Sequence, residues 1–258
     1  NTLVLHEPAL AAKSMKIPVS VHVHELPEGD LELCKLLNSD PDEIVLHTLD
    51  YADQVITNSR LVHDYLLSAQ ARLLPDATER PISFHIVPNT ADIEQLQKIA
   101  LPPYVTGHSP FLTVGMISSN LPKKGLDDFI KVAKILESKA PTVQFKLIGP
   151  QNQHTDKLLP RNEKVQVRKN LTLEGYVSDP EKALESLDVV LNLSHCKETF
   201  GRTILEAMAA GRATICYEWG GLPELVVPEE TGVLVPFRDI DSVADSIIAM
   251  VNNSTRLK

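Results

Sequence analysis

Short apolar runs of strand length alternate along this chain with longer stretches in which apolar residues recur every three or four positions. Runs of β-branched residues that alternate with helical patterns are typical of βαβ units and a parallel sheet. Several predicted strands are apolar on both faces, as are parallel strands that helices cover on both sides. The pattern predicts strands at residues 3–6, 19–24, 54–58, 84–87, 111–114, 144–148, 171–173, 189–193, 214–216 and 233–235, and helices over 61–74, 125–138, 179–187, 203–210 and 240–252.

The alternation breaks between residues 89 and 110. A turn-like stretch, NTAD, is followed by a polar segment for which we expect a short helix. The next stretch is LPPYVTGHSP, in which proline and glycine cluster without periodicity. We therefore predict an α/β protein of two domains, residues 1–95 and residues 96–258.

Charge and cysteine content exclude several classes of protein. The 258 residues carry 25 Lys and Arg against 34 Asp and Glu, a formal net charge of −9, and they contain no basic stripe. A protein that follows nucleic-acid phosphates is basic or has such a stripe, so we expect no nucleic-acid partner. Three widely separated cysteines form neither a disulfide framework nor a zinc spacing. They fit a reducing compartment, so we expect a cytoplasmic protein.

The segment CKETFGRTILEAMAAG, residues 196–211, combines two carboxylates with a predicted helix start. The apolar strand LDVVLNLS precedes it, and open α/β sheets bind ligands at the carboxyl ends of strands, where helix N-termini favour anions. Gly201 lets the backbone approach a phosphate, and Arg202 adds positive charge. Glu206, about one turn inside the helix, can accept hydrogen bonds from ribose hydroxyls, and Glu198 can face a second sugar. The segment predicts a site for a nucleotide-diphosphate sugar.

The same residues have a simpler interpretation. Arg202 and Glu206 are four positions apart and could form a surface ion pair that contributes a few tenths of a kcal/mol. Glu198 could merely complement the helix dipole. The residues by themselves leave both interpretations open.

The motif block ETFGRTILEAMAAGRATICYEWGGLPELV resembles the C-terminal block of the retaining family 4 glycosyltransferases, which have the GT-B fold. The resemblance covers nearly the whole chain. YADQVITNS and HIVPNTAD resemble the closing strands of the family's N-terminal domain, and FLTVGMISSNLPKKGLDDFIKVAKIL, VQFKLIGP and LTLEGYVSD resemble the opening of its C-terminal domain. The resemblance implies two Rossmann-like, doubly wound parallel-sheet domains. The first would be an incomplete acceptor-side domain and the second would bind the nucleotide-sugar.

The resemblance also implies roles for the residues that match family motifs. Glu198 would approach the transferred sugar and His24, in VHVHEL, would lie near the reaction centre, so we expect these two to be catalytic. Glu206 would bind the ribose. The other residues expected to bind the sugar donor are Gly115, Lys123, Lys124, Tyr176, Val177, Phe200, Gly201, Arg202, Gly220 and Gly221. Without the resemblance, the lysine pair could be an exposed helix entry and the glycine pair a tight turn.

The chain departs from the family pattern in two respects. Met116 stands where the family usually has arginine, so one cationic contact to the diphosphate is missing unless Lys123 or Arg202 replaces it. The family's Gly-rich first loop and a final helix are not found, so we expect a fragment that binds a nucleotide-sugar but transfers little sugar. These departures favour an alternative, a non-catalytic nucleotide-sugar-binding or scaffolding module of a larger protein. The intact pair of glutamates argues against it.

Two further patterns suggest metal sites but have simpler interpretations. His22 and His24 lie on one face of a predicted strand and could be half of a metal site, but no further ligands follow in a fitting context. The motifs at 40–42 (DPD) and 239–241 (DID) resemble a metal-binding Asp-x-Asp, but both look like helix starts with a capping aspartate. We therefore expect no metal.

Residues and resemblance together predict an enzyme that moves a sugar from a nucleotide-diphosphate sugar to an acceptor hydroxyl, with retention and without a metal. Lys124, the amides at the helix start and Arg202 would stabilise the charge on the leaving diphosphate. We expect no cofactor besides the nucleotide-sugar substrate, and a carbohydrate, lipid-linked or protein acceptor. Any membrane contact would be peripheral and would come from segments outside this chain.

Overall fold

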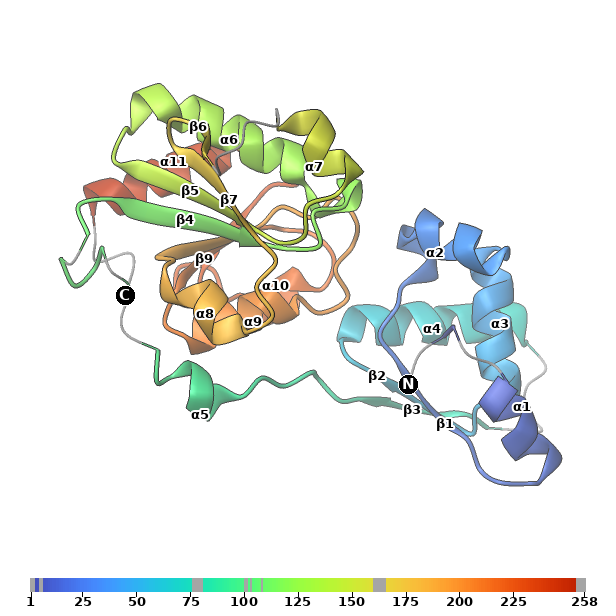
Figure 1. Ribbon diagram of the computed structural model, residues 1–258. Helices are drawn as coiled ribbons and strands as arrows, with labels where there is room; N and C mark the ends of the chain where they lie inside the picture. Colours follow the sequence, from blue (N-terminus) through green and yellow to red (C-terminus); the bar gives the residue numbers. More distant parts are fainter. Residues whose placement is uncertain are drawn as a thin grey trace. The chain divides into compact units, whose positions relative to one another are not determined.

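The computed structural model describes residues 3–4, 7–75, 81–99, 102, 104–107, 109–159 and 166–253. Its contacts divide the chain into two compact units (Figure 1). The first consists of Asn1–Asn89 and Cys196–Phe200, and the second of Thr90–His195 and Gly201–Lys258. Each unit has its own parallel sheet and its own apolar core.

The first unit is built on a parallel sheet of three strands in the order β1-β2-β3. Val23 of β1 and Val55 of β2 are fully buried, and helices α3 and α4 pack Ile44 and Leu66 into the same apolar cluster. The strands are β1 (Ser20–Val23), β2 (Gln54–Thr57) and β3 (Ser83–Ile86). The helices are α1 (Glu7–Ser14), the 3-10 turn η1 (Pro27–Gly29), α2 (Leu31–Leu37), α3 (Pro41–Tyr51) and α4 (Arg60–Leu73).

The second unit is built on a sheet in the order β10-β9-β8-β4-β5-β7-β6, in which only β6 runs antiparallel to its neighbour. The chain first builds the sheet outward from β4 through β5 and then returns to add β8, β9 and β10 on the other side. The direction of winding therefore reverses between β4 and β8, which is a topological switch point. The strands are β4 (Leu112–Ile117), β5 (Val143–Ile148), β6 (Gln166–Arg168), β7 (Leu171–Gly175), β8 (Val189–Asn192), β9 (Ala213–Tyr217) and β10 (Val233–Val235).

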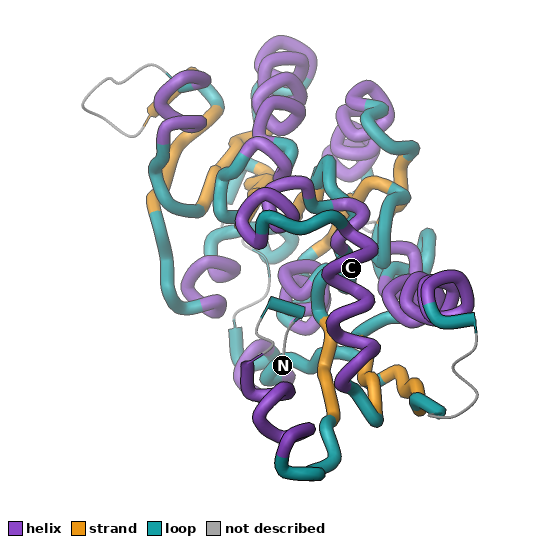
Figure 2. Tube along the Cα trace, turned by 90° about the vertical axis from the view of Figure 1, so that its right-hand side faces the viewer, coloured by secondary structure: helices purple, strands orange, loops and turns teal. Residues whose placement is uncertain are grey.

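Helices cover both faces of the second sheet (Figure 1), and Figure 2 colours the helices and strands along the Cα trace. α6 and α11 bury Phe129 and Ile247 on one face, and α8 and α9 bury Leu184 and Ile204 on the other. No described helix combines the length and apolar character that crossing a membrane requires. The helices are α5 (Ile93–Leu96), the 3-10 turn η3 (Pro122–Lys124), α6 (Leu126–Lys139), α7 (Gln153–Leu158), α8 (Pro180–Glu185), α9 (Arg202–Ala209), α10 (Leu222–Leu225) and α11 (Ile240–Asn252).

The α/β alternation predicted from the apolar pattern is confirmed, with small shifts at element ends. Helices α1, α2 and α7 and strand β6 were not predicted, and of α3 only the start at Asp40 was. α1 and α2 bury none of their side chains, so they lack the periodic apolar stripe by which a helix is recognised. The strand expected at residues 3–6 is wrong for residues 3 and 4, which are not in a strand, and residues 5 and 6 lie outside the described part of the chain.

Both Asp-x-Asp motifs are helix starts, which confirms that interpretation. Asp40 accepts a hydrogen bond from the amide of Glu43, whose side chain accepts one from the amide of Asp40, so the two residues form a capping box. Asp239 caps α11 by accepting a hydrogen bond from the amide of Ser242. Each first aspartate therefore has a structural function at its helix.

Strand β4 extends to Ile117, so the expectation that Gly115 ends this strand is wrong. Gly115 is buried within β4, and a Cβ added there would lie 2.3 Å from Cδ1 of Leu187. Met116 is 2% exposed and packs in the cluster between the sheet and helices α6 and α11. Close packing on the two faces of β4 therefore explains why position 115 is a glycine and position 116 a methionine. The contact of Gly115 with a sugar donor stays a prediction.

The turn between β4 and α6 lies unusually close to the end of β8. Gly125 ends η3 with φ +77°, a conformation that side chains disfavour. A Cβ added to it would lie 1.7 Å from the carbonyl oxygen of Leu193. Because both the backbone conformation and the space exclude a side chain, this turn requires glycine.

We expect Gly125→Ala to lower the free energy of unfolding by about 3 kcal/mol, because it adds a backbone clash to the left-handed strain. Gly211→Ala is the matched control. Its φ of +66° is similar, but nothing lies within 4 Å of the added Cβ. It should lose only about 1 kcal/mol. Urea unfolding of both variants makes the comparison, and equal losses would contradict the close approach of Gly125 and Leu193.

We expect Met116→Arg, which restores the family's usual residue, to destabilise the second unit by about 3 kcal/mol or more. A guanidinium without partners would be buried in an apolar cluster. Met116→Leu, which keeps the volume, should cost less than about 1.5 kcal/mol. Thermal unfolding measures both. An arginine variant as stable as the parent would mean that this side chain can leave the core.

Candidate functional site

In the second unit, most residues predicted to bind the sugar donor follow strands at one edge of the sheet. β9, β8, β4, β5 and β7 are consecutive parallel strands, so the loops after them leave the sheet at the same edge. Open α/β sheets bind ligands at this edge, beside the switch point. Lys123 and Lys124 follow β4, Tyr176 and Val177 follow β7, Gly201 and Arg202 begin the helix after β8, and Gly220 and Gly221 follow β9.

The lysine pair lies on a turn that is fastened to the end of β8. The carbonyl of Lys123 accepts hydrogen bonds from the amide of His195 (2.8 Å) and from Oγ of Ser194 (3.1 Å). The amide of Lys124 donates to the carbonyl of Leu121 (2.9 Å). Both lysines are half-buried rather than fully exposed. Two cationic side chains are thus carried by a turn that is fixed beside the switch point.

Helix α9 begins at a glycine without a capping side chain. Gly201 has φ +89°, and a Cβ added there would lie 2.5 Å from Cδ2 of Leu222. The first amides of an α-helix lack partners within the helix. Together with the positive end of the helix dipole, they favour an anion at this entrance.

Arg202 and Glu206 form the ion pair that the simpler interpretation predicted. Nε of Arg202 donates to Oε1 of Glu206 at 2.8 Å. The arginine side chain is 68% exposed and the glutamate 14%. The exposed guanidinium can turn into water, whereas the mostly buried carboxylate would then need another hydrogen-bond donor, such as a ligand hydroxyl. The contact is compatible with a ligand-binding role for either residue.

The loops after β7 and β9 differ in exposure. The Tyr176 side chain is largely exposed, while Val177 packs against the apolar cluster between the sheet and helices α8 and α9. Gly220 has φ +67° and leads into the buried Gly221 at the start of α10, so the tight-turn interpretation of this glycine pair is confirmed. The ring of Trp219 stacks on Phe237 at 4.3 Å between centroids.

Glu198, Phe200 and His24 belong to the first unit. His24 directly follows β1, and its carbonyl accepts a 2.8 Å hydrogen bond from Oγ1 of Thr199. Thr199 also accepts a hydrogen bond from Asn58. The structure therefore brings the segment that carries Glu198 beside the strand end that carries His24. Their expected catalytic roles stay predictions.

The ring of His22 in β1 packs at a tilt of 44° against the ring of His24, which follows the strand, with centroids 4.1 Å apart. Burial and the neighbouring His24 lower the pKa of His22. In the part of the chain that the structure describes, no group of three or more His, Cys, Asp or Glu side chains is arranged to hold a metal ion.

A buried carboxylate that sequence reasoning missed lies in the first turn of α6. Asp128 is 3% exposed, and its Oδ2 accepts hydrogen bonds from Nε2 of His195 (2.6 Å) and the hydroxyl of Tyr217 (2.9 Å). Burial raises the pKa of Asp128, but hydrogen bonds from His195, Tyr217 and Lys131 outweigh burial and lower it. The only sequence signal was a second aspartate at a position of α6 that faces the core.

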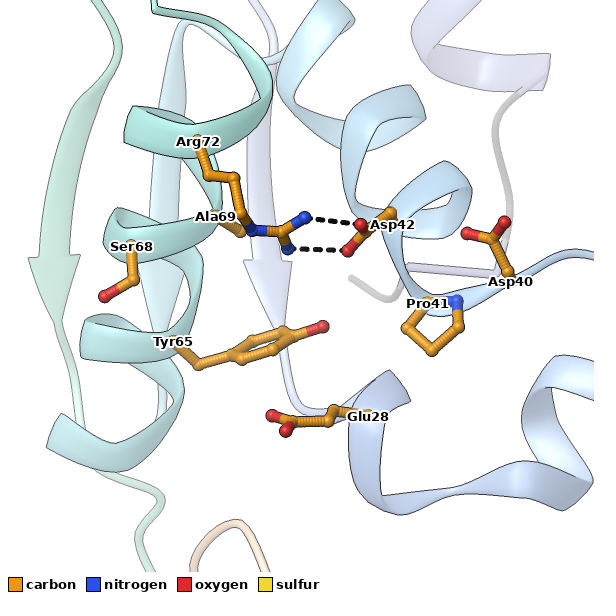
Figure 3. Close-up of a pocket in the computed structure, with 8 residues that line it drawn as sticks. All are labelled: Glu28, Asp40, Pro41, Asp42, Tyr65, Ser68, Ala69 and Arg72. Atoms are coloured by element: carbon orange, nitrogen blue, oxygen red, sulfur yellow. Dashed lines mark hydrogen bonds and ion pairs between the residues drawn. The ribbon is translucent and has the colours of Figure 1, made fainter.

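A separate hollow of about 470 Å³ lies on the first unit (Figure 3). Asp42 and Arg72 form a bidentate ion pair across it, and Asp40 caps α3. The phenol of Tyr65 points towards Glu28, and burial and nearby carboxylates raise its pKa to about 12. None of the predicted site residues lines this hollow, whose lining residues are Glu28, Asp40, Pro41, Asp42, Tyr65, Ser68, Ala69 and Arg72.

Relatives of known activity are sugar transferases. The chain is 30% identical over 141 residues to a poly(ribitol-phosphate) alpha-N-acetylglucosaminyltransferase of Staphylococcus aureus, with 54% of this chain and 28% of that protein covered. It is 24% identical over 259 residues to a GDP-mannose-dependent alpha-(1-6)-phosphatidylinositol monomannoside mannosyltransferase of Mycobacterium tuberculosis, with 96% and 63% covered. The chain thus spans less than two thirds of the length of these relatives.

Solved structures share the fold. The chain superposes on Anabaena HepE in complex with UDP and glucose with a TM-score of 0.74 and 21% identity, covering 97% of this chain and 66% of that one. For TarM the TM-score is 0.69, also at 21% identity, covering 93% and 45%. Both are GT-B glycosyltransferases with Rossmann-like domains, which confirms the predicted fold class.

The sequence itself matches a family over most of the second unit. Residues 109–258, more than half of the chain, match the family Glycosyl transferases group 1. This match begins just before β4. It includes the turn Pro122–Gly125 (the lysine turn), the start of α9 at Gly201 (the α9 entrance) and the glycine pair after β9. The chain belongs to the group 1 glycosyltransferases.

Proposed function

We propose that the chain binds a nucleotide-diphosphate sugar at the carboxyl edge of the second sheet and takes part in transferring the sugar to an acceptor hydroxyl, with retention and without a metal. Similar proteins support a nucleotide-sugar substrate, because HepE has been crystallised with UDP-glucose and the M. tuberculosis mannosyltransferase is GDP-mannose-dependent. The chemistry of the acceptor stays open, and a carbohydrate, lipid-linked or protein hydroxyl is proposed.

One observation carries the proposal: a turn with two lysines and the start of helix α9 follow adjacent strands at the switch point of this sheet. The turn after β4 carries Lys123 and Lys124, and the helix after β8 begins with an uncapped glycine. The strands that precede them, β4 and β8, are adjacent and parallel. A diphosphate between them would receive lysine charge from one side and helix amides from the other.

The proposed reaction breaks the bond between the anomeric carbon and the diphosphate oxygen, and the diphosphate keeps the electron pair. The acceptor oxygen forms the new bond on the same face, and its proton passes to an oxygen of the leaving diphosphate. Lys124, the α9 amides and Arg202 are proposed to stabilise the charge that develops on the diphosphate. Glu206 is proposed to bind the ribose, and Glu198 and His24 to act on the sugar and the acceptor hydroxyl.

We expect Glu206→Ala to weaken binding of UDP or GDP, whichever binds the parent more tightly, by about 1–3 kcal/mol, the scale of losing hydrogen bonds to a buried charged group. Isothermal titration calorimetry measures the change. Glu230→Ala is the matched control, because Glu230 is an exposed glutamate beyond α10, and it should leave the affinity unchanged. Equal affinity of the Glu206 variant and the parent would refute the ribose assignment.

We expect EDTA to leave UDP and GDP affinity unchanged, because lysine side chains and helix amides supply the positive charge at this edge. The measurement is a titration in the presence of EDTA, repeated with added magnesium or manganese. A loss of affinity in EDTA that either ion restores would contradict metal-independent binding.

A second candidate is a non-catalytic nucleotide-sugar-binding module, and the observation that favours it is Met116. The residue found in place of the family's arginine packs in the core, so no cation extends from this position. Incubation with radiolabelled UDP- and GDP-sugars discriminates the two. Release or transfer of the sugar supports the enzyme, and binding without either supports the module.

A further inference from the structure

The buried carboxylate of Asp128 is the centre of a cluster that joins three loops of the second unit. His195 follows β8, Tyr217 ends β9, and Arg238 follows β10. Asp128 itself lies in the first turn of α6, just after the lysine turn. Side chains from the ends of three neighbouring strands therefore converge on the helix that the lysine turn begins.

The hydrogen bonds of the cluster fix the tautomer of His195. Nη2 of Arg238 lies 3.0 Å from Nδ1 of His195. An arginine only donates hydrogen bonds, so Nδ1 must accept and carry no proton. Nε2 then bears the proton and donates it to Oδ2 of Asp128 at 2.6 Å. These two contacts hold the ring of His195 in one tautomer and one orientation.

His195 contacts both ends of the segment that leads from the lysine turn into α6. Its ring donates to Asp128 of the helix, and its amide donates to the carbonyl of Lys123 in the turn at 2.8 Å. The neighbouring Ser194 adds a second hydrogen bond to the same carbonyl. One residue of the loop after β8 thus sets the position of the turn relative to the helix.

Aromatic packing restrains the rings of this cluster. Phe237 meets His195 and Tyr217 edge to face, at 6.2 Å and 5.6 Å between centroids, and stacks on Trp219. Such pairs favour defined ring orientations. The hydrogen-bonding rings are therefore held in place by their neighbours as well as by Asp128.

Stability alone does not account for a charge at this position. An ionised carboxylate loses hydration on burial, and apolar residues of similar volume often stabilise a core equally well or better. A charge-assisted hydrogen bond, in contrast, fixes donor and acceptor within narrow limits of distance and direction. The hydrogen bonds of Asp128 are therefore suited to fixing the positions of His195 and Tyr217 relative to helix α6.

We propose that Asp128, His195 and Tyr217 are positioning residues that fasten the Pro122–Gly125 turn to the end of β8 and so hold Lys124 at the diphosphate. This inference rests on the proposed function for its ligand and adds to it the residues that place the lysine. The three side chains act through the turn and need no contact with the substrate.

The first test uses Tyr217→Phe, which removes only the hydroxyl that donates to Asp128. UDP affinity should fall about 5–10-fold, the scale of one lost hydrogen bond, whereas UMP affinity should change by less than about twofold. Tyr65→Phe, at a half-buried phenol of the first unit, is the matched control and should change neither. Equal losses for UMP and UDP would contradict the proposal that the cluster positions Lys124 at the second phosphate, which UMP lacks.

A double-mutant cycle of Tyr217→Phe with Lys124→Ala tests whether the two residues are coupled in UDP binding. If Tyr217 acts through Lys124, the loss caused by Tyr217→Phe should largely disappear in the Lys124→Ala background. Additive losses would overturn the inference. His195→Gln should retain more UDP affinity than His195→Ala, since glutamine keeps a hydrogen-bond donor within reach of Asp128. Equal affinities of these two variants would also count against it.

Hydrogen exchange tests the turn separately from the nucleotide. In Tyr217→Phe, the amides of Lys124 and Gly125 should exchange at least about tenfold faster, while those of α11 keep the parent rate. Unchanged exchange at the turn would overturn the inference even if UDP binds. If the parent binds neither UDP nor GDP, the proposed function fails, and the exchange result still decides whether the cluster fastens the turn.

Discussion

The close approach of Gly125 to the carbonyl of Leu193 is the constraint on which the site of the second unit depends. β4 and β8 are adjacent and parallel at the switch point, so the loops that follow them leave the sheet side by side at the same edge. A glycine with positive φ lets the first loop lie directly against the backbone of the second strand. The carbonyl of Lys123 is then within reach of the His195 amide and the Ser194 hydroxyl. The lysine turn and the α9 entrance consequently form two sides of one edge.

This arrangement resolves an apparent conflict in the charge of the chain. A net charge of −9 disfavours phosphate binding over long distances. Within a few ångströms, however, half-buried lysines and the amides of a helix start act in surroundings that water screens less. The buried carboxylate of Asp128 is hydrogen-bonded by His195, Tyr217 and Lys131. The proposed preference for a phosphate therefore depends on the local arrangement of lysines and amides rather than on the net charge of the chain.

The sequence predicted the α/β alternation, the parallel sheets and most elements of the second unit, because buried parallel strands and amphipathic helices have distinct apolar periods. α11 was predicted to its ends, since Asp239 marks its start and an apolar stripe runs to Asn252. It could not predict α1, which buries no side chain, or the position of Gly115 inside β4, which depends on contact with Leu187. Motifs placed the lysine turn and α9 correctly at one edge. The Asp128 cluster was beyond prediction, because its members are separated by 67 and 89 positions and meet only in the folded chain.

The seven-stranded sheet of the second unit ends on both sides in strands of three residues, β6 and β10. β6 also runs against its neighbour and shifts register within its short length. An exposed strand edge offers unpaired amides and carbonyls to any other chain, and long, flat edges promote aggregation most strongly. Edges this short and irregular present few such groups in a row. The fold thus limits strand-to-strand association of neighbouring molecules at the edges of its larger sheet.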